Sequence, residues 1–169
     1  MNALADPLVA EYLNENFVST YLKVGAFQII NGQKVGGNVA SYFCVPEGGV
    51  LHAVAGKTDA KTLLKEARWA MDIRKSAYAF STNPETGAVH LKKFAKQISS
   101  AHTERYYAEG RMMWGEKSLP ATMPRGTTQQ AQTHWLLAKN PAARLQDVYP
   151  TVWRQILNER LSDLPVDVR

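Results

Sequence analysis

The sequence predicts a mixed α/β protein in two parts: helices and strands over residues 1–80, then a helical C-terminal extension over residues 81–169. In the first part, runs rich in β-branched and aromatic residues, bounded by Gly, Pro and Asn, indicate strands. In the second part, apolar residues recur at helical spacing and indicate helices. The turn-rich segment 81–87 (STNPETG) separates the two and is the predicted domain boundary.

The first predicted element is a helix that begins after Asp6 and ends near residue 16. Asp6 is a suitable N-cap, and Pro7 suits the first helical position because its missing N–H would have no helical partner there. The run that follows, residues 17–24 (FVSTYLKV), is rich in β-branched and aromatic residues. We expect it to form a strand.

Two hairpins are expected next. Asn31-Gly32 is a strong signal for a tight turn, and it predicts a hairpin over residues 27–35. Residues 39–45 and 50–55 then indicate two antiparallel strands joined by the four-residue turn Pro-Glu-Gly-Gly.

Helices are expected in the rest of the chain. The first is capped by Thr58 or Asp59, carries a broad apolar stripe and extends to about Phe80. Segment 110–127 is rich in Gly and Pro and is expected to be irregular. The other predicted helices cover residues 88–110, 128–139 and 147–164.

The composition is that of an ordinary globular protein. Hydrophobic residues make up 45% of the 169 residues and charged residues 21%. No apolar run approaches the ~20 residues that a transmembrane helix needs, and residues 1–6 lack the basic and apolar stretches of a signal peptide. We therefore expect a cytoplasmic protein without a membrane partner.

The net charge of +5 raises the alternative of a nucleic-acid partner. Nucleic-acid binding usually shows as Lys and Arg clustered on one face, whereas here these residues are spread along the chain. The interpretation of the basic residues as solvated helix faces is therefore preferred. Nucleic-acid binding remains a third hypothesis, which a steep loss of affinity with salt would reveal.

Few residues are of the types that bind metals or carry redox chemistry. A single cysteine, Cys44, excludes an intrachain disulfide and any multi-cysteine metal site. The four histidines, His52, His90, His102 and His134, are scattered without H-x-x-x-H or H-E-x-x-H spacing. We therefore expect no metal, no cofactor and no catalytic residue.

Cys44 has two interpretations. The strand alternation through this hairpin favours a small buried hydrophobe. The alternative is a reactive thiol, which would need a nearby cation to lower its pKa, or His52 as a partner across the hairpin. No orienting carboxylate is suggested by spacing, and Glu104 and Glu109 are interpreted as solvated helix positions.

Three stretches together resemble a known fold family. They are residues 6–18 (DPLVAEYLNENFV), residues 43–51 (FCVPEGGVL) and Gly56 followed by a capped helix. Their order and spacing are similar to thioredoxin-like proteins of the group that includes the thiol-reductase domains of bacterial disulfide reductases. The resemblance covers residues 6–75 and implies an incomplete thioredoxin-like fold, while no family pattern is identified for residues 81–169.

The sequence departs from that family where the redox chemistry resides. The resemblance places the family's Cys-x-x-Cys dithiol before Met1, and its cis-proline near Asn38. A cis bond without proline costs ~2.5–4 kcal/mol, so the substitution is not a neutral one. Because the corresponding loop borders the substrate groove in the family, Gly36, Gly37, Asn38 and Val39 are the candidate peptide-binding residues.

The family's central first strand would also fall before Met1, which leaves the sheet to be completed in another way. Three alternatives stay open: the hairpin over residues 27–35 fills the gap, a partner chain donates a strand, or the native chain begins further upstream.

These observations lead to two function hypotheses. The first is a redox-inactive, thioredoxin-like protein that is not an enzyme and binds a protein or peptide, as a scaffold or a homodimer. The second is a truncated or remnant thiol–disulfide oxidoreductase whose dithiol lies upstream of Met1.

Overall fold

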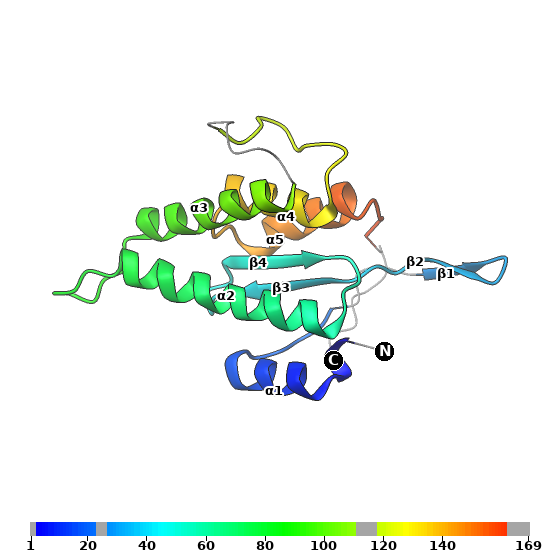
Figure 1. Ribbon diagram of the computed structural model, residues 1–169, viewed down its shortest axis with the longest axis horizontal. Coiled ribbons are helices and arrows are strands. Elements are labelled where there is room, and N and C mark those ends of the chain that lie inside the picture. Colours follow the sequence, from blue (N-terminus) through cyan, green and yellow to red (C-terminus); the bar gives the residue numbers. More distant parts are fainter. Residues whose placement is uncertain (1–2, 23–26, 111–117, 162–169) are drawn as a thin grey trace.

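The computed structural model describes residues 3–22, 27–110 and 118–161, and it shows a mixed α/β architecture. A short antiparallel hairpin of β3 (Ala40–Cys44) and β4 (Val50–Ala55) forms the centre. It lies between α1 (Pro7–Asn16) and α2 (Ala60–Ser81) on one side and the later helices on the other (Figure 1). The predicted second hairpin is therefore confirmed.

The core has a separate part on each side of this hairpin. Towards α1 and α2, the side chains of Val9, Phe43, Val54 and Leu63 pack together. Towards α4 (Gln129–Lys139) and α5 (Leu145–Thr151), the buried cluster includes the following residues: Val50, Ala53, Trp135, Leu137 and Val152. Every residue of β4 except the last is buried, since helices cover both of its faces.

The first hairpin, of β1 (Phe27–Ile30) and β2 (Gln33–Gly36), projects from the body of the molecule (Figure 1). Asn31 and Gly32 both have positive φ, +52° and +76°, as a tight hairpin turn requires. The predicted turn is confirmed. Among the described residues, β1–β2 and β3–β4 form separate two-stranded sheets, so the first hairpin does not extend the central one.

The strand predicted at residues 17–24 is wrong over its described part. Residues 17–21 have no regular secondary structure, and Leu22 forms only an isolated bridge. Val18 is fully exposed and Tyr21 is 59% exposed. β-Branched and aromatic residues favour a strand only where a neighbouring strand is available. Residues 17–21 pair with no strand among the described residues, although the Phe17 ring packs against Phe43.

The predicted α2 and α4 are confirmed, and the cap predicted for α2 is Asp59. The carboxylate of Asp59 accepts a hydrogen bond from the Thr62 N–H, and the Thr128 hydroxyl accepts one from the Ala131 N–H. α3 (Leu91–Glu109) begins three residues later than residue 88 and packs against both α2 and α4. Residues 118–127 are irregular, as predicted, and residues 111–117 lie outside the described part of the chain.

The helix predicted over residues 147–164 is shorter and begins earlier. α5 is followed by a π-helical turn, Val152–Ile156, in which the Leu157 N–H donates to the Val152 carbonyl. Asn158 then adopts a positive φ of +53°, which directs the chain out of the helix. The predicted apolar stripe is nonetheless buried as far as Leu157, whereas Leu164 lies outside the described residues.

None of the helices that the structure describes is long and apolar enough to cross a membrane.

Candidate metal centre

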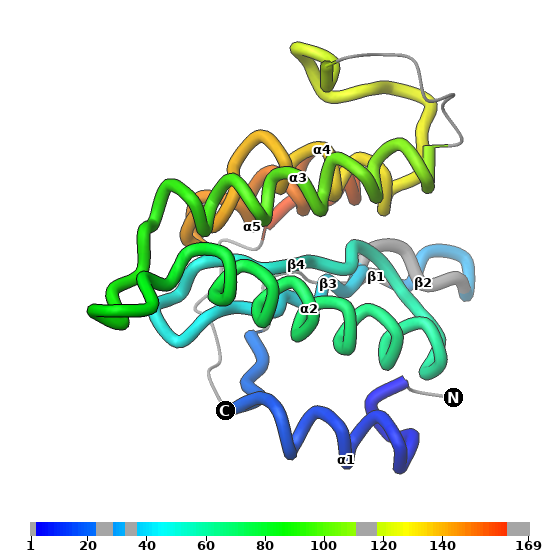
Figure 2. Tube along the Cα trace, turned by 60° about the vertical axis from the view of Figure 1, so that its left-hand side comes forward, coloured from blue at the N-terminus to red at the C-terminus, as the bar shows by residue number. Residues whose placement is uncertain are grey.

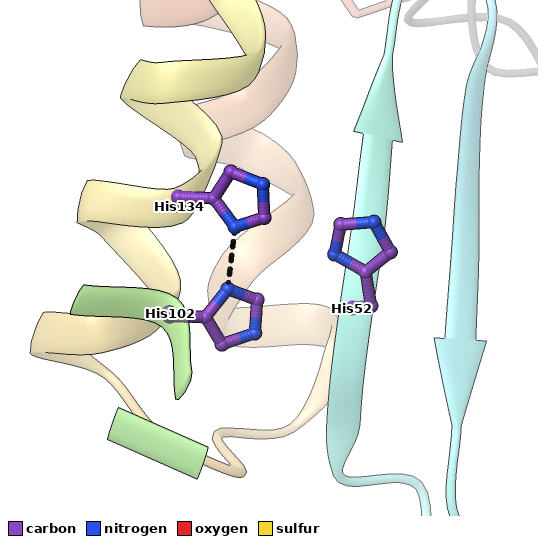
Figure 3. A group of neighbouring side chains, drawn as sticks. All are labelled: His52, His102 and His134. Atoms are coloured by element: carbon purple, nitrogen blue, oxygen red, sulfur yellow. Dashed lines mark hydrogen bonds between the residues drawn. The ribbon is translucent and has the colours of Figure 1, made fainter. Parts of the chain in front are cut away.

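Three of the four histidines meet in the interior, although each comes from a different element. His52 lies on β4, His102 on α3 and His134 on α4, and all three are 0% exposed (Figure 3). One ring nitrogen of each lies within 4.8 Å of the others. Figure 2 shows the corresponding layers, with β4 passing beneath α3 and α4.

Local folding explains why these side chains point inwards. His102 shares the buried face of α3 with Ile98 and Tyr106, which are one helical turn before and after it. His134 lies in the densely buried stretch of α4 between Thr133 and Leu137. The side chains of both histidines are 0% exposed.

His102 and His134 share a hydrogen bond between their Nδ1 atoms, at 2.8 Å. The Nε2 of His102 lies 2.9 Å from the Leu51 carbonyl oxygen, which can only accept, so Nε2 carries the proton. The Nδ1 of a neutral His102 therefore presents a lone pair. It accepts the hydrogen bond that the His134 Nδ1–H donates.

Within the described part of the chain, His52 is hydrogen-bonded through one of its two ring nitrogens only. Its Nε2 donates to the Glu66 carboxylate at 3.0 Å. Its Nδ1 is buried and has no hydrogen-bond partner among the described residues. In Figure 3 this nitrogen, next to the ring carbon that bears the side chain, lies on the side of His102 and His134.

The Nε2 of His134 faces two groups, at 3.5 Å each: a carboxylate oxygen of Glu109 and the amide nitrogen of Gln130. All three histidines thus have the same arrangement. Each Nε2 faces a polar group outside the cluster, and the Nδ1 atoms are left to one another.

Burial sets the charge of the cluster. Burial lowers the pKa of His52 and of His102 well below 6.5, and repulsion by His134 in its protonated form lowers both further. Both rings are therefore neutral at pH 7. Neutral imidazole is the form that coordinates a metal ion.

Two carboxylates and one guanidinium form the outer layer of the site. Arg105 contacts a Glu109 oxygen at 2.8 Å and a Glu66 oxygen at 3.4 Å. Burial raises the pKa of Glu109, but the hydrogen bond and charge of His134 and the charge of Arg105 outweigh it, so the net shift is downward. The ring of Trp69 meets all three imidazoles at near-perpendicular angles, with centroids 4.7–5.3 Å apart.

A surface cavity of about 290 Å³ reaches this outer layer. Glu66, Glu109 and Gln130 line it together with residues of the β4–α2 connection and the first turns of α2. Glu109 and Gln130, the two groups that face the His134 Nε2, therefore border this cavity, whereas Glu66 is only 4% exposed.

The donor set fits a transition metal ion. Tetrahedral zinc with Zn–N bonds of ~2.0–2.1 Å places its ligand nitrogens ~3.3 Å apart. Here one pair is 2.8 Å apart and all three nitrogens lie within 4.8 Å. Shifts of ~1 Å would bring the rings into coordination, and three protein ligands leave a fourth position for water or another ligand.

The structure does not bring Cys44 and His52 together as a pair. Cys44 is opposite Val50 in the hairpin register, whereas His52 is opposite Phe43 and hydrogen-bonds Glu66. Burial raises the pKa of the Cys44 thiol. That shift is opposite to the one that a reactive thiolate needs.

Of the predicted peptide-binding residues, Gly36 ends β2, and Gly37, Asn38 and Val39 connect β2 to β3. Gly37 has a φ of +71°, and the Asn38 N–H donates to the Glu159 carboxylate at 3.0 Å. Val39 is 49% exposed. None of the four contributes a ligand atom to the histidine cluster.

Sequence spacing did not reveal this cluster, because His102 is 32 residues from His134 and 51 residues from its other partner, Leu51. The sequence pattern that could have indicated the cluster is the presence of histidines at otherwise apolar positions of three separate elements. Glu109, predicted to be solvated, is instead half-buried and paired with Arg105, while Glu104 is exposed as expected. His90 is exposed at the start of α3, outside the cluster.

Comparison with known proteins gives no relative for this site: no protein-family model, curated protein or solved structure matches the chain.

Proposed function

We propose that this protein binds a divalent transition metal ion, zinc foremost, through the Nδ1 atoms of His52, His102 and His134. The observation that carries the proposal is the buried Nδ1 of His52, which faces the other two rings and has no hydrogen-bond partner among the described residues. A buried polar atom without a partner costs ~1–3 kcal/mol. A metal ion would use that lone pair.

The outer contacts support the same assignment. Histidines that bind a metal generally donate their second N–H to a carboxylate or a backbone carbonyl. His52 donates to Glu66 in this way and His102 to the Leu51 carbonyl. Glu109 offers the equivalent oxygen to His134.

The ligand type supports zinc. Imidazole nitrogens suit zinc, copper, iron and nickel, and discriminate against magnesium and calcium, which prefer oxygen. A set of three nitrogens with an open fourth position is one of the arrangements that zinc adopts. The site also links β4, α3 and α4, so a bound ion would hold these elements together.

Titration of metal-free protein with Zn²⁺, and with Co²⁺ as a coloured substitute, tests the proposal. We expect one ion per chain and a cobalt visible spectrum of a nitrogen-ligated site. Replacing His52, His102 or His134 singly by Ala should abolish both, while His90→Ala should leave them unchanged. Absence of stoichiometric binding, or equal loss in the His90 variant, would reject a metal function.

A second candidate is the protein-binding function that the sequence suggests, with a second copy of this chain as the partner. The observation that favours it is the projecting β1–β2 hairpin, on which Ile29 is 70% and Ile30 50% exposed. Sedimentation of the wild type should then show a dimer, and Ile29→Ser with Ile30→Ser a monomer. A wild type that sediments as a monomer at all concentrations would remove this candidate.

The thioredoxin-like fold and the oxidoreductase alternative remain predictions. The buried Cys44 thiol, with its raised pKa, gives the oxidoreductase no support. Under the protein-binding hypothesis, Cys44→Ser should leave binding of the partner unchanged. The chain should not catalyse the reduction of insulin disulfides by dithiothreitol.

A further inference from the structure

We propose that Arg105 is a positioning residue of the metal centre: it holds Glu66 and Glu109 in place, and these carboxylates keep the Nδ1 atoms of two histidines directed at the ion. This inference rests on the proposed metal function. It adds the contact that orients the histidine rings before the ion binds.

Arg105 is itself held in a fixed place. Its guanidinium carbon lies 4.4 Å from the centre of the Trp69 ring, and its side chain is 17% exposed. One guanidinium nitrogen contacts Glu109 at 2.8 Å, and the other contacts Glu66 at 3.4 Å. The planar fork of arginine can serve two carboxylates at once, which an ammonium group on a flexible stem does less well.

Glu66 transmits this contact to His52. The same carboxylate oxygen, Oε2, faces both the Arg105 guanidinium and the His52 Nε2. An ionised carboxylate only accepts hydrogen bonds. His52 must therefore carry its proton on Nε2, which leaves the Nδ1 lone pair free to coordinate.

Glu109 faces the His134 Nε2 as Glu66 faces that of His52, but the Gln130 amide also faces this nitrogen. The Gln130 amide nitrogen donates to the Ala53 carbonyl at 3.0 Å, which identifies it as the NH₂ group. At 3.5 Å from the His134 Nε2 it can donate there as well, and so favours the tautomer with the proton on Nδ1. Glu109 favours the opposite tautomer, with the proton on Nε2 and Nδ1 free.

Metal binding therefore requires His134 to change partners. Without a metal, its Nδ1–H donates to His102. With a metal, Nδ1 coordinates and Nε2–H donates to Glu109. By fixing Glu109 at 2.8 Å, Arg105 keeps the acceptor in place for the metal-bound tautomer.

The test measures Zn²⁺ affinity by chelator competition in Arg105→Met, Glu109→Gln and the wild type. We expect both variants to bind ~10–100-fold more weakly, as loss of such outer partners generally causes. Arg105→Lys should recover part of the loss. The matched controls are Glu104→Gln, on the exposed face of the same helix, and Arg74→Met on α2, and both should bind as the wild type does.

Nitrogen-15 NMR of the histidine rings separates positioning from a merely structural role. In the wild type, zinc should remove the proton from the His134 Nδ1 and leave one on Nε2, and the same change should be incomplete in Glu109→Gln at equal zinc. If Arg105→Met does not fold, Glu109→Gln carries the test, because Glu109 is only half-buried.

The two proposals fail in different ways. A wild type that binds no metal overturns the metal function. A wild type that binds zinc through the three histidines, with Arg105→Met and Glu109→Gln binding as tightly and showing the same His134 tautomers, overturns the role of Arg105 alone.

Discussion

At the scale of the residue, the chemistry depends on how each imidazole nitrogen is used. A lone buried histidine is usually satisfied on both sides, but His52 has one nitrogen bonded to Glu66 and the other without a partner among the described residues. His102 and His134 share one proton between two Nδ1 atoms. His52 and His102 are neutral at pH 7, and each has a Nδ1 lone pair that suits a cation.

The same burial makes the metal-free protein sensitive to mild acid. The pKa values of His52 and His102 lie below 6.5 in the folded state and near 6.5 in the unfolded chain. The unfolded chain therefore binds more protons below pH 6.5, and the free energy of unfolding falls as pH falls, by up to ~1.4 kcal/mol per pH unit for each histidine.

Urea unfolding of metal-free protein between pH 8 and 5 measures this loss. The charged or titratable groups that face the two rings are Glu66 from α2, Arg105 and Glu109 from α3, and His134 from α4. The Glu109 carboxyl titrates below its usual 4.5, outside this window. A free energy of unfolding that stays constant between pH 7.5 and 5 would contradict the prediction.

At the scale of the element, capping and turn chemistry made much of the fold predictable. Asp6, Asp59 and Thr128 begin their helices, and Asn31-Gly32 makes its turn, because each depends on atoms only a few residues away. The strand at residues 17–24 failed because a strand depends on a partner that local sequence does not specify. The cluster of His52, His102 and His134 was not foreseen for a similar reason: it exists only once β4, α3 and α4 are packed together.

The cap of α4 links local structure to the site, since α4 carries His134. The Thr128 hydroxyl accepts from the Ala131 N–H at 3.1 Å, so Thr128→Ala should lower the free energy of unfolding by ~1 kcal/mol. Denaturant unfolding of the metal-free protein measures it. The control is Thr122→Ala in the exposed irregular segment before α4, and an equal loss there would refute the capping explanation.

At the scale of the whole molecule, the three ligands connect both sequence-defined parts of the chain. His52 belongs to the central hairpin, whereas His102 and His134 belong to helices that pack over it. The hairpin has only two strands, so the packing of α2 and α4 against β4, and of α3 against both helices, supplies much of what holds the interior together. An ion bound to all three residues adds a link that the unfolded chain cannot reproduce.

Zinc should therefore stabilise the fold in proportion to its affinity. At a free concentration 100 times the dissociation constant, binding to the folded state alone adds ~2.7 kcal/mol to the free energy of unfolding. Thermal unfolding followed by circular dichroism should show a rise in Tm with zinc, and a chelator should reverse it. His134→Ala should show no rise, while His90→Ala should match the wild type. A Tm that rises equally in His134→Ala would place the ion elsewhere, and a Tm that zinc leaves unchanged in the wild type would mean that the three histidines do not hold an ion in the folded protein.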